Sequence, residues 1–510
     1  MSIKSILTEK SLGILMHPSS FPGGSESGTF GIEAKEWIKK LSNYGINYWQ
    51  FLPLTPTDST GSPYSAPSSF ALNPWFLDIN ELIENRFVFL SKEEELEIKN
   101  NNNNNNNNYF DFDLADNLSK KLGDHLLNAW KYQSEKRKKD FLKWIRNNYW
   151  VEDYSIFMVI REEFNRLPWW QWPDEFKQRN IEFLNQWIKE NKEAILIKKL
   201  IQWHLDNQWR TIKRFSKSKG IKLIGDLPFY VSRDSVDVWS NKKLFSVSQN
   251  GDLIFQSGVP PDYFSSNGQL WGTPTYFWSK HKRENFDWWR RRFKRQFELV
   301  DLLRLDHFRA LSGYWRVEGN SETAINGKWI NSPGSKILNI LKKDLKADYL
   351  PIIAEDLGVI TPDVEKLRRN FGLPGMKILQ FAFDGNSDNP YLPHNIEGEN
   401  WVVYTGTHDN STTTSWWEGL DNNIKTKLNA DYKLSNNPSW NLMEIGMQTA
   451  ANLFIAPIQD ILSLDDSCRL NTPGTIKNNW RWKLNKPLEE IEPQLKDFSE
   501  MGKNYGRINY

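Results

Sequence analysis

The sequence predicts a parallel (β/α)8 barrel with inserted, largely helical subdomains. Eight short apolar runs recur along the chain, at residues 12–16, 48–52, 222–225, 299–305, 351–354, 376–381, 401–404 and 453–456. Most of these runs are continuous rather than alternating, which is typical of strands buried on both faces. Amphipathic segments lie between several of them, and repeated strand–helix–strand units favour a parallel sheet.

Helical periodicity supports the connections between the runs. Residues 33–43 place Ala34, Trp37, Ile38 and Leu41 at helical spacing. Residues 361–370 begin with Thr-Pro, which is typical of a helix start. A doubly wound open sheet is the alternative, but eight units and the lack of a Gly-x-Gly-x-x-Gly turn count against it.

Uneven spacing between the runs predicts insertions into one barrel that spans residues 1–510. About 170 residues separate the second and third runs, too many for a loop, so residues 75–218 should form a helical subdomain. The Trp-rich stretch 144–209 lies inside it. A second insertion, at about residues 228–298, is expected to cover a groove. Residues 100–108 are nine consecutive Asn, whose composition predicts a mobile loop.

Composition excludes several classes of partner. The net charge is only +2, so nothing draws the chain toward nucleic acid or acidic membranes. The basic run at residues 290–295 is better explained as a solvated helix face than as a nucleic-acid patch. The single cysteine excludes an intrachain disulfide and a cysteine-rich zinc site. We find no signal peptide or membrane span, so a cytoplasmic location is expected by default.

Aromatic residues are unusually frequent, with 25 Trp, 17 Tyr and 29 Phe. Composition alone favours a large packed core, because buried aromatic rings are the common case. Some rings could instead line a groove as stacking platforms for sugars, whose C–H faces are apolar.

Acidic residues stand at the ends of four predicted strands, where barrel enzymes place their catalytic groups. They are Asp226, Asp306, Glu355 and Asp409. Glycosidic bond chemistry needs two carboxyl groups across the bond, one as acid and base and the other as nucleophile or base. Arg304, two residues before Asp306, should share its strand face and keep it ionised. His307 should point to the opposite face.

The acidic residues, the histidines and the Gly-rich loop have alternative interpretations. Single carboxylates at a barrel mouth can cap helices or form ion pairs. His307, His408 and the acids could bind a divalent metal, but no His-Glu-x-x-His motif supports this. The Gly-rich loop 23–31 could cradle phosphate, but its glycines fit neither dinucleotide nor P-loop spacing, and we interpret it as a flexible rim.

Three motifs together resemble the α-amylase superfamily, and specifically glycoside hydrolase family 77, the amylomaltases. They are Arg-Leu-Asp-His-Phe-Arg at 304–309, Ala-Glu-Asp-Leu-Gly at 354–358 and Thr-His-Asp-Asn at 407–410. They follow the family's order, and the resemblance extends from residue 17 to residue 474. Further matches include segments 49–54, 61–64, 73–74, 225–228, 258–264 and 471–474.

The resemblance implies a retaining 4-α-glucanotransferase, in which Asp306 is the nucleophile, Glu355 the general acid and base, and Asp409 the transition-state stabiliser. It also implies that Arg304 and His408 hold the same sugar and that Tyr64 stacks next to the bond. Tyr263 and Phe264 would cover the groove, and Gln269 and Trp271 would contact acceptor sugars. The implied substrate-binding residues also include Asp226, Asp262 and Asn471.

The expected partners are an α-1,4-glucan donor and a glucose or glucan acceptor, with no nucleic acid and no membrane. No cofactor and no catalytic metal are expected, because acid–base and covalent catalysis suffice; a structural calcium stays open. Two alternatives remain: an amylase-type hydrolase and a non-catalytic glucan-binding protein. The sequence sets neither the oligomeric state nor the preferred chain length.

The chain departs from the family pattern at four places. Thr273 stands where the family usually has Asn, and Ala310 where it usually has Gly. The loop 23–31 is longer than the family's turn, and the Asn tract is foreign to its motifs. These departures bear on acceptor binding and leave every catalytic carboxylate in place.

Overall fold

The computed structural model describes residues 5–23, 27–95, 109, 111–261, 266–358, 360–434 and 436–508. The Asn tract at 100–108 therefore lies outside the described residues, as do Asp262, Tyr263 and Phe264. Within the described parts, no helix is long and apolar enough to cross a bilayer.

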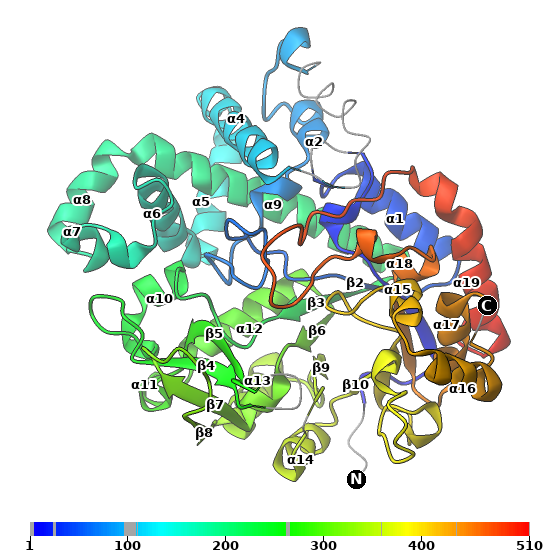
Figure 1. The fold of residues 1–510 in the computed structure, drawn as a ribbon. Helices are drawn as coiled ribbons and strands as arrows, with labels where there is room; N and C mark the ends of the chain where they lie inside the picture. Colours follow the sequence, from blue (N-terminus) through cyan, green and yellow to red (C-terminus); the bar gives the residue numbers. More distant parts are fainter. Residues whose placement is uncertain are drawn as a thin grey trace.

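Eight parallel strands form the centre of the molecule, in the order β10-β11-β12-β1-β2-β3-β6-β9 (Figure 1). The amide of Ala354 donates to the carbonyl of Pro374 at 2.8 Å, which joins the last strand to the segment before the first and nearly closes the barrel. The predicted fold class is confirmed, and each strand falls in or beside a predicted apolar run. The strands are β1 (Ser11–Leu15), β2 (Tyr48–Gln50), β3 (Lys222–Leu227), β6 (Leu302–Leu305), β9 (Ile352–Ala354), β10 (Gly375–Ile378), β11 (Trp401–Tyr404) and β12 (Leu453–Pro457).

Helices cover the outside of the barrel and explain why its strands are apolar on both faces. Every residue of β1 and of β12 is buried. The first helix buries Ala34, Trp37, Ile38 and Leu41, the stripe that the sequence predicts. The covering helices are α1 (Ile32–Asn43), α12 (Asp287–Leu299), α13 (Gly334–Leu345), α14 (Pro362–Asn370), α15 (Thr413–Glu418), α16 (Asn422–Tyr432), α17 (Pro438–Gln448), α18 (Ile458–Ile461) and α19 (Glu492–Asn504).

The chain between β2 and β3 forms a helical subdomain on one side of the barrel, at the upper left of Figure 1. Its longest helix, α9, packs against α4 and α6 and returns the chain to the barrel. The helices are α2 (Ile79–Glu84), α4 (Phe112–Trp130), α5 (Glu135–Asn147), α6 (Trp150–Glu163), α7 (Asp174–Lys177), α8 (Ile181–Glu190) and α9 (Lys192–Ser218).

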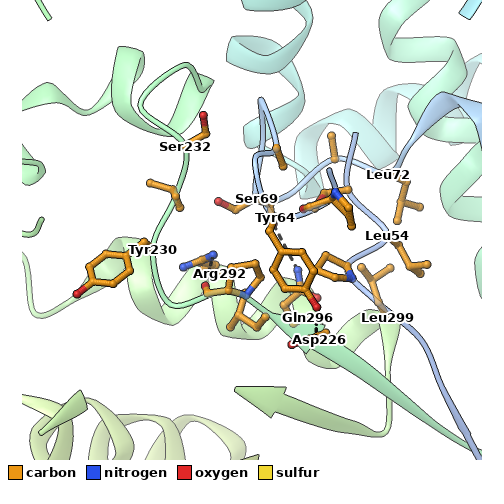
Figure 2. Close-up of a pocket in the computed structure, with 18 residues that line it drawn as sticks. Leu54, Tyr64, Ser69, Leu72, Asp226, Tyr230, Ser232, Arg292, Gln296 and Leu299 are labelled. Carbon is orange, nitrogen blue, oxygen red and sulfur yellow. Dashed lines mark hydrogen bonds between the residues drawn. The ribbon is translucent and has the colours of Figure 1, made fainter. Parts of the chain in front are cut away.

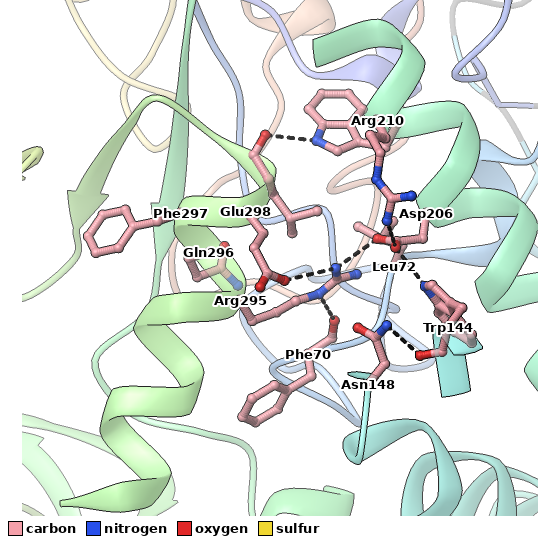
Figure 3. A network of polar contacts seen from close by, with 12 residues as sticks. Phe70, Leu72, Trp144, Asn148, Asp206, Arg210, Arg295, Gln296, Phe297 and Glu298 are labelled. Atoms are coloured by element: carbon pink, nitrogen blue, oxygen red, sulfur yellow. Dashed lines mark hydrogen bonds and ion pairs between the residues drawn. The ribbon is translucent and has the colours of Figure 1, made fainter. Parts of the chain in front are cut away.

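A buried polar network fixes this subdomain to the barrel (Figure 3). Arg295 of α12 donates to Asp206 of α9 at 2.7 Å and to the carbonyl of Phe70 at 3.0 Å. The second oxygen of Asp206 accepts from Trp144 at 2.7 Å and from Arg210 at 2.9 Å. Removing one partner of this buried ion pair would leave the other charge uncompensated, so the contact between the subdomain and α12 depends on both residues.

The second insertion contributes to an antiparallel sheet of order β5-β4-β7-β8, at the lower left of Figure 1. Two of its strands, β4 (Phe255–Val259) and β5 (Gln269–Pro274), lie between β3 and β6. The other two, β7 (Gly313–Glu318) and β8 (Gly327–Asn331), follow β6, so this unit also uses residues after 298. The short helices α10 (Val236–Ser240) and α11 (Trp278–Arg283) accompany it.

Single turns of 3-10 helix complete the described elements. They are η1 (Pro18–Ser20), η2 (Pro74–Phe76), η3 (Trp169–Gln171), η4 (Lys242–Leu244), η5 (Phe308–Leu311), η6 (Leu379–Phe381), η7 (Pro393–Asn395), η8 (Asp466–Cys468) and η9 (Leu488–Ile491).

Candidate active site

The predicted acidic residues all lie at the carboxyl ends of barrel strands. Asp226 is the penultimate residue of β3, and Asp306 directly follows β6. Glu355 directly follows β9, and Asp409 lies in the loop after β11. Parallel strands present their carboxyl ends at one mouth, so these side chains gather there although long stretches of sequence separate them.

Arg304 links two of the carboxylates. Its Nη1 donates to Oδ2 of Asp226 at 2.6 Å, and its Nη2 lies 3.0 Å from Oδ1 of Asp306. The guanidinium is buried, which opposes its charge, yet Asp226 and Asp306 together hold the pKa of Arg304 well above its usual value. The side chain of Asp306 keeps 30% of its surface exposed, so a substrate can reach it while Arg304 orients it.

Glu355 is held by backbone amides from two loops. The amide of His307 donates to Oε2 at 2.6 Å, and that of Leu357 donates to Oε1 at 3.1 Å. Burial, and after it the negative charge of Asp306, raise the pKa of Glu355 to about 7, against the opposing effects of Arg304 and the two amides. The group is therefore about half protonated near neutral pH, as a residue that both gives and takes a proton requires.

A left-handed backbone conformation at His307 produces this contact. With φ of 51°, the chain turns sharply after β6 and directs the His307 amide at Glu355. The ring lies against Trp271, with centroids 4.9 Å apart, and burial lowers the pKa of His307 to about 4. The imidazole is therefore neutral and packs on the second insertion.

Asp409, in the loop after β11, contacts two side chains. Nδ2 of Asn471 donates to its Oδ1 at 2.7 Å, and Nε2 of His408 lies 3.4 Å from the same oxygen. Its side chain is 46% exposed. Oδ1 is thus held in place while the rest of the carboxylate faces the mouth.

Tyr64 contacts both Asp226 and His408, and Figure 2 shows its position beside Asp226. Its hydroxyl donates to Oδ2 of Asp226 at 2.7 Å, and its ring stacks on His408 with centroids 5.2 Å apart and 10° between the planes. Burial raises the pKa of Tyr64 well above its usual value, so the hydroxyl stays a donor. Burial also raises the pKa of Asp226, whose Oδ1 has no hydrogen-bond partner among the described residues.

Two site residues were missed from sequence. Arg469 donates to the carbonyls of Asp409 and Asn471 and to the hydroxyl of Ser411, the latter two at 2.7 and 3.0 Å. It therefore joins the loop that carries Asp409 to the loop that carries its partner. Its position two residues before Asn471 is the signal that could have found it. Trp480 is buried and packs on Tyr64 and His408, with ring centroids 5.8 and 5.9 Å away.

Gln269 and Trp271, the residues expected to contact the acceptor, lie on β5, where the Trp271 ring is 37% exposed. Oε1 of Gln269 accepts from the Trp271 indole at 3.3 Å. Thr273, which replaces the usual Asn, hydrogen-bonds the hydroxyl of Ser257 at 2.5 Å on the neighbouring strand. Asp262, Tyr263 and Phe264 lie outside the described residues, so their expected roles stay predictions.

Comparison with known proteins identifies the family of the chain. Residues 16–489 match the family model described as 4-alpha-glucanotransferase. A 4-alpha-glucanotransferase from Thermus thermophilus is 36% identical over 485 residues, which cover 93% of this chain and 95% of that protein. One from Clostridium butyricum is 39% identical over 473 residues, with coverage of 92% and 95%. The solved amylomaltase from Streptococcus agalactiae in complex with acarbose has a TM-score of 0.92 at 32% identity, covering 98% of this chain and all of that one.

A pair of carboxyl groups at the mouth of a barrel fits the class of enzymes that act on glycosidic bonds. Within that class the matches are specific to one group. The chain belongs to the 4-alpha-glucanotransferase family, which confirms the resemblance seen in its sequence motifs.

Proposed function

We propose that this enzyme transfers a segment of an α-1,4-glucan to the 4-hydroxyl of glucose or of another glucan, by a retaining double displacement. One observation carries the proposal: Arg304 orients Asp306 at the mouth, beside Glu355, whose pKa is raised to about 7. An oriented carboxylate beside a carboxyl group that holds its proton near neutral pH is the pair that this chemistry needs.

In the first step Glu355, protonated, gives its proton to the leaving oxygen while Asp306 attacks the anomeric carbon. A glycosyl–Asp306 ester forms and the glycosidic bond breaks. In the second step Glu355 removes the proton from the acceptor's 4-hydroxyl, whose oxygen attacks the same carbon and releases Asp306. Two inversions retain the α configuration. We expect the two carboxyl groups to lie about 5–5.5 Å apart, as in retaining enzymes.

The remaining groups would hold the sugar at the cleavage point. Asp409 and His408 present a carboxylate and an imidazole on one side, and Arg304 a guanidinium on the other. Tyr64 would stack on the sugar next to the bond from its place on His408. Gln269 and Trp271 would contact the acceptor, with Asp262, Tyr263 and Phe264 covering the groove. We also propose a cytoplasmic location and no requirement for a cofactor.

A product profile tests the reaction type. The protein is incubated with maltotriose alone and with maltotriose plus glucose, and the chain lengths are then resolved by chromatography. A ladder of longer and shorter maltodextrins is the expected result. Glucose and maltose without longer chains would make the protein a hydrolase, and glucan binding without turnover would make it a binding protein.

The pH dependence follows from the raised pKa of Glu355. Because the first step needs the protonated acid, kcat/KM for the donor should fall as the pH rises through about 7. Initial rates of transfer from maltotriose, measured across this range, give the position of the alkaline limb. The alkaline fall in rate should be missing from the pH profile of Glu355→Gln. If the fall is unchanged in that variant, another group causes it.

Arg469 provides a test of the loop that carries Asp409. Arg469→Ala should lower kcat roughly 10- to 100-fold, because a small displacement of a positioned group costs that much. KM and the thermal unfolding temperature should change far less. Arg214→Ala, which removes an exposed arginine on α9, is the control. A loss of stability that matched the loss of activity would give Arg469 a structural role only.

A further inference from the structure

Two tryptophans pair on the outer face of the antiparallel sheet. Trp315 of β7 lies directly opposite Trp329 of β8, with ring centroids 5.4 Å apart and 64° between the planes. Their neighbour Tyr314 points the other way and is buried against Tyr230, with centroids 6.2 Å apart. Because side chains alternate along a strand, the Trp pair lies on the face that turns away from this buried cluster.

Trp329 is an exception among the tryptophans. Of the 25 in the chain, all within the described residues, only Trp271 and Trp329 are exposed, at 37% and 46%. Trp271 is the residue that we expect to contact the acceptor. An exposed ring on the edge strand presents apolar surface to which a ligand can bind.

Contacts join Trp329 to the loops that carry the nucleophile and the acid. The guanidinium of Arg309, three residues after Asp306, lies 4.1 Å from the centre of the Trp329 ring. Its Nη2 donates at 3.1 Å to the hydroxyl of Thr361, six residues after Glu355. These contacts tie the Trp pair to the two segments that follow Asp306 and Glu355 in the chain.

A third contact reaches the strand that carries the acceptor-side residues. The indole of Trp315 donates to the carbonyl of Ala324 at 2.8 Å, and the amide of Ala324 donates to the carbonyl of Asn267 at 2.9 Å. Asn267 comes two residues before Gln269. Both rings are therefore held in place before a ligand binds. Less side-chain entropy is then lost on binding.

We infer that Trp329, supported by Trp315 and Arg309, is a remote binding site for the acceptor glucan, beyond the sugars at the reaction centre. This inference rests on the proposed function for its ligand. Arg309 lies over one face of the ring and fixes its orientation, and the exposed part of the ring is offered to the C–H face of a sugar. In this proposal a single glucose beside Glu355 does not reach Trp329, whereas a longer maltodextrin does. The site therefore selects long acceptors.

The test compares transfer from maltotriose to labelled glucose and to a labelled maltodextrin of at least six units. Trp329→Ala should lower kcat/KM for the maltodextrin roughly three- to ten-fold, the range expected for one aromatic contact, and leave glucose transfer at the wild-type value. Trp329→Phe should keep part of the preference. Tyr349→Ala is the control, because Tyr349 is also 46% exposed but precedes β9, at the end of the barrel opposite Glu355.

Equal losses with both acceptors would show that Trp329 only supports the fold, and no loss with either would remove it from the binding path; both results overturn the inference. If the wild-type enzyme transfers nothing, the proposed function fails instead, and calorimetric titration with the maltodextrin alone decides the inference. Weaker binding by Trp329→Ala than by Tyr349→Ala supports the site, and equal binding overturns it.

Discussion

Replacing Asp306 by Asn should lower kcat/KM for transfer by on the order of 10⁴-fold or more, as expected when the nucleophile of a covalent mechanism is removed. The side-chain amide of asparagine cannot form the glycosyl ester. Arg304 pairs with one other carboxylate among the described residues, that of Asp226. Asp226, the second partner of Arg304, is 2% exposed and already accepts from Tyr64. It cannot replace Asp306 without moving both neighbours.

Transfer from maltotriose measured by chromatography gives the activity, and titration with a maltodextrin shows whether the variant still binds. Asp384→Asn is the matched control, since Asp384 is exposed in the segment after β10. Retained transfer in Asp306→Asn would remove Asp306 from the chemistry.

Glu355→Gln should lower kcat for maltodextrin donors by about 10²- to 10⁴-fold, the usual contribution of general acid–base catalysis. The two oxygens of Glu355 accept from the amides of His307 and Leu357, and glutamine, with a single oxygen, keeps one of these two contacts. It has no proton to give to the leaving oxygen.

A donor with a good leaving group separates the two roles of Glu355. An α-maltosyl fluoride needs no protonation of its leaving group, so the first step should recover in the variant while transfer to the acceptor stays slow. Equal losses with maltotriose and with the fluoride would show that the substitution damages the site in general and not the proton donor.

The sequence predicted the barrel because strands buried on both faces are continuous apolar runs, and all eight are strands in the structure. It also predicted which carboxylates meet, because strand ends share one mouth, and it placed Arg304 beside Asp306 from the period of a strand. Both predictions follow from the local geometry of single strands, and the barrel then brings the strand ends together.

What sequence reasoning did not find depends on contacts between distant loops. The left-handed turn at His307 breaks the strand alternation and so aims its amide at Glu355, 48 residues away. Arg469 acts on a loop 60 residues before it. Burial, which only the packed mouth can show, is the main cause of the raised pKa of Glu355, ahead of the neighbouring charge.

The most direct test of the account is to trap the intermediate. Glu355→Gln is incubated with an α-maltosyl fluoride and no acceptor, digested with a protease, and examined by peptide mass spectrometry. The expected result is a maltosyl adduct on the peptide that contains Asp306. The adduct should be absent from the double variant with Asp306→Asn and should be released with α configuration when maltose is added. An adduct on another residue, or fluoride release with an inverted product and no adduct, would contradict it.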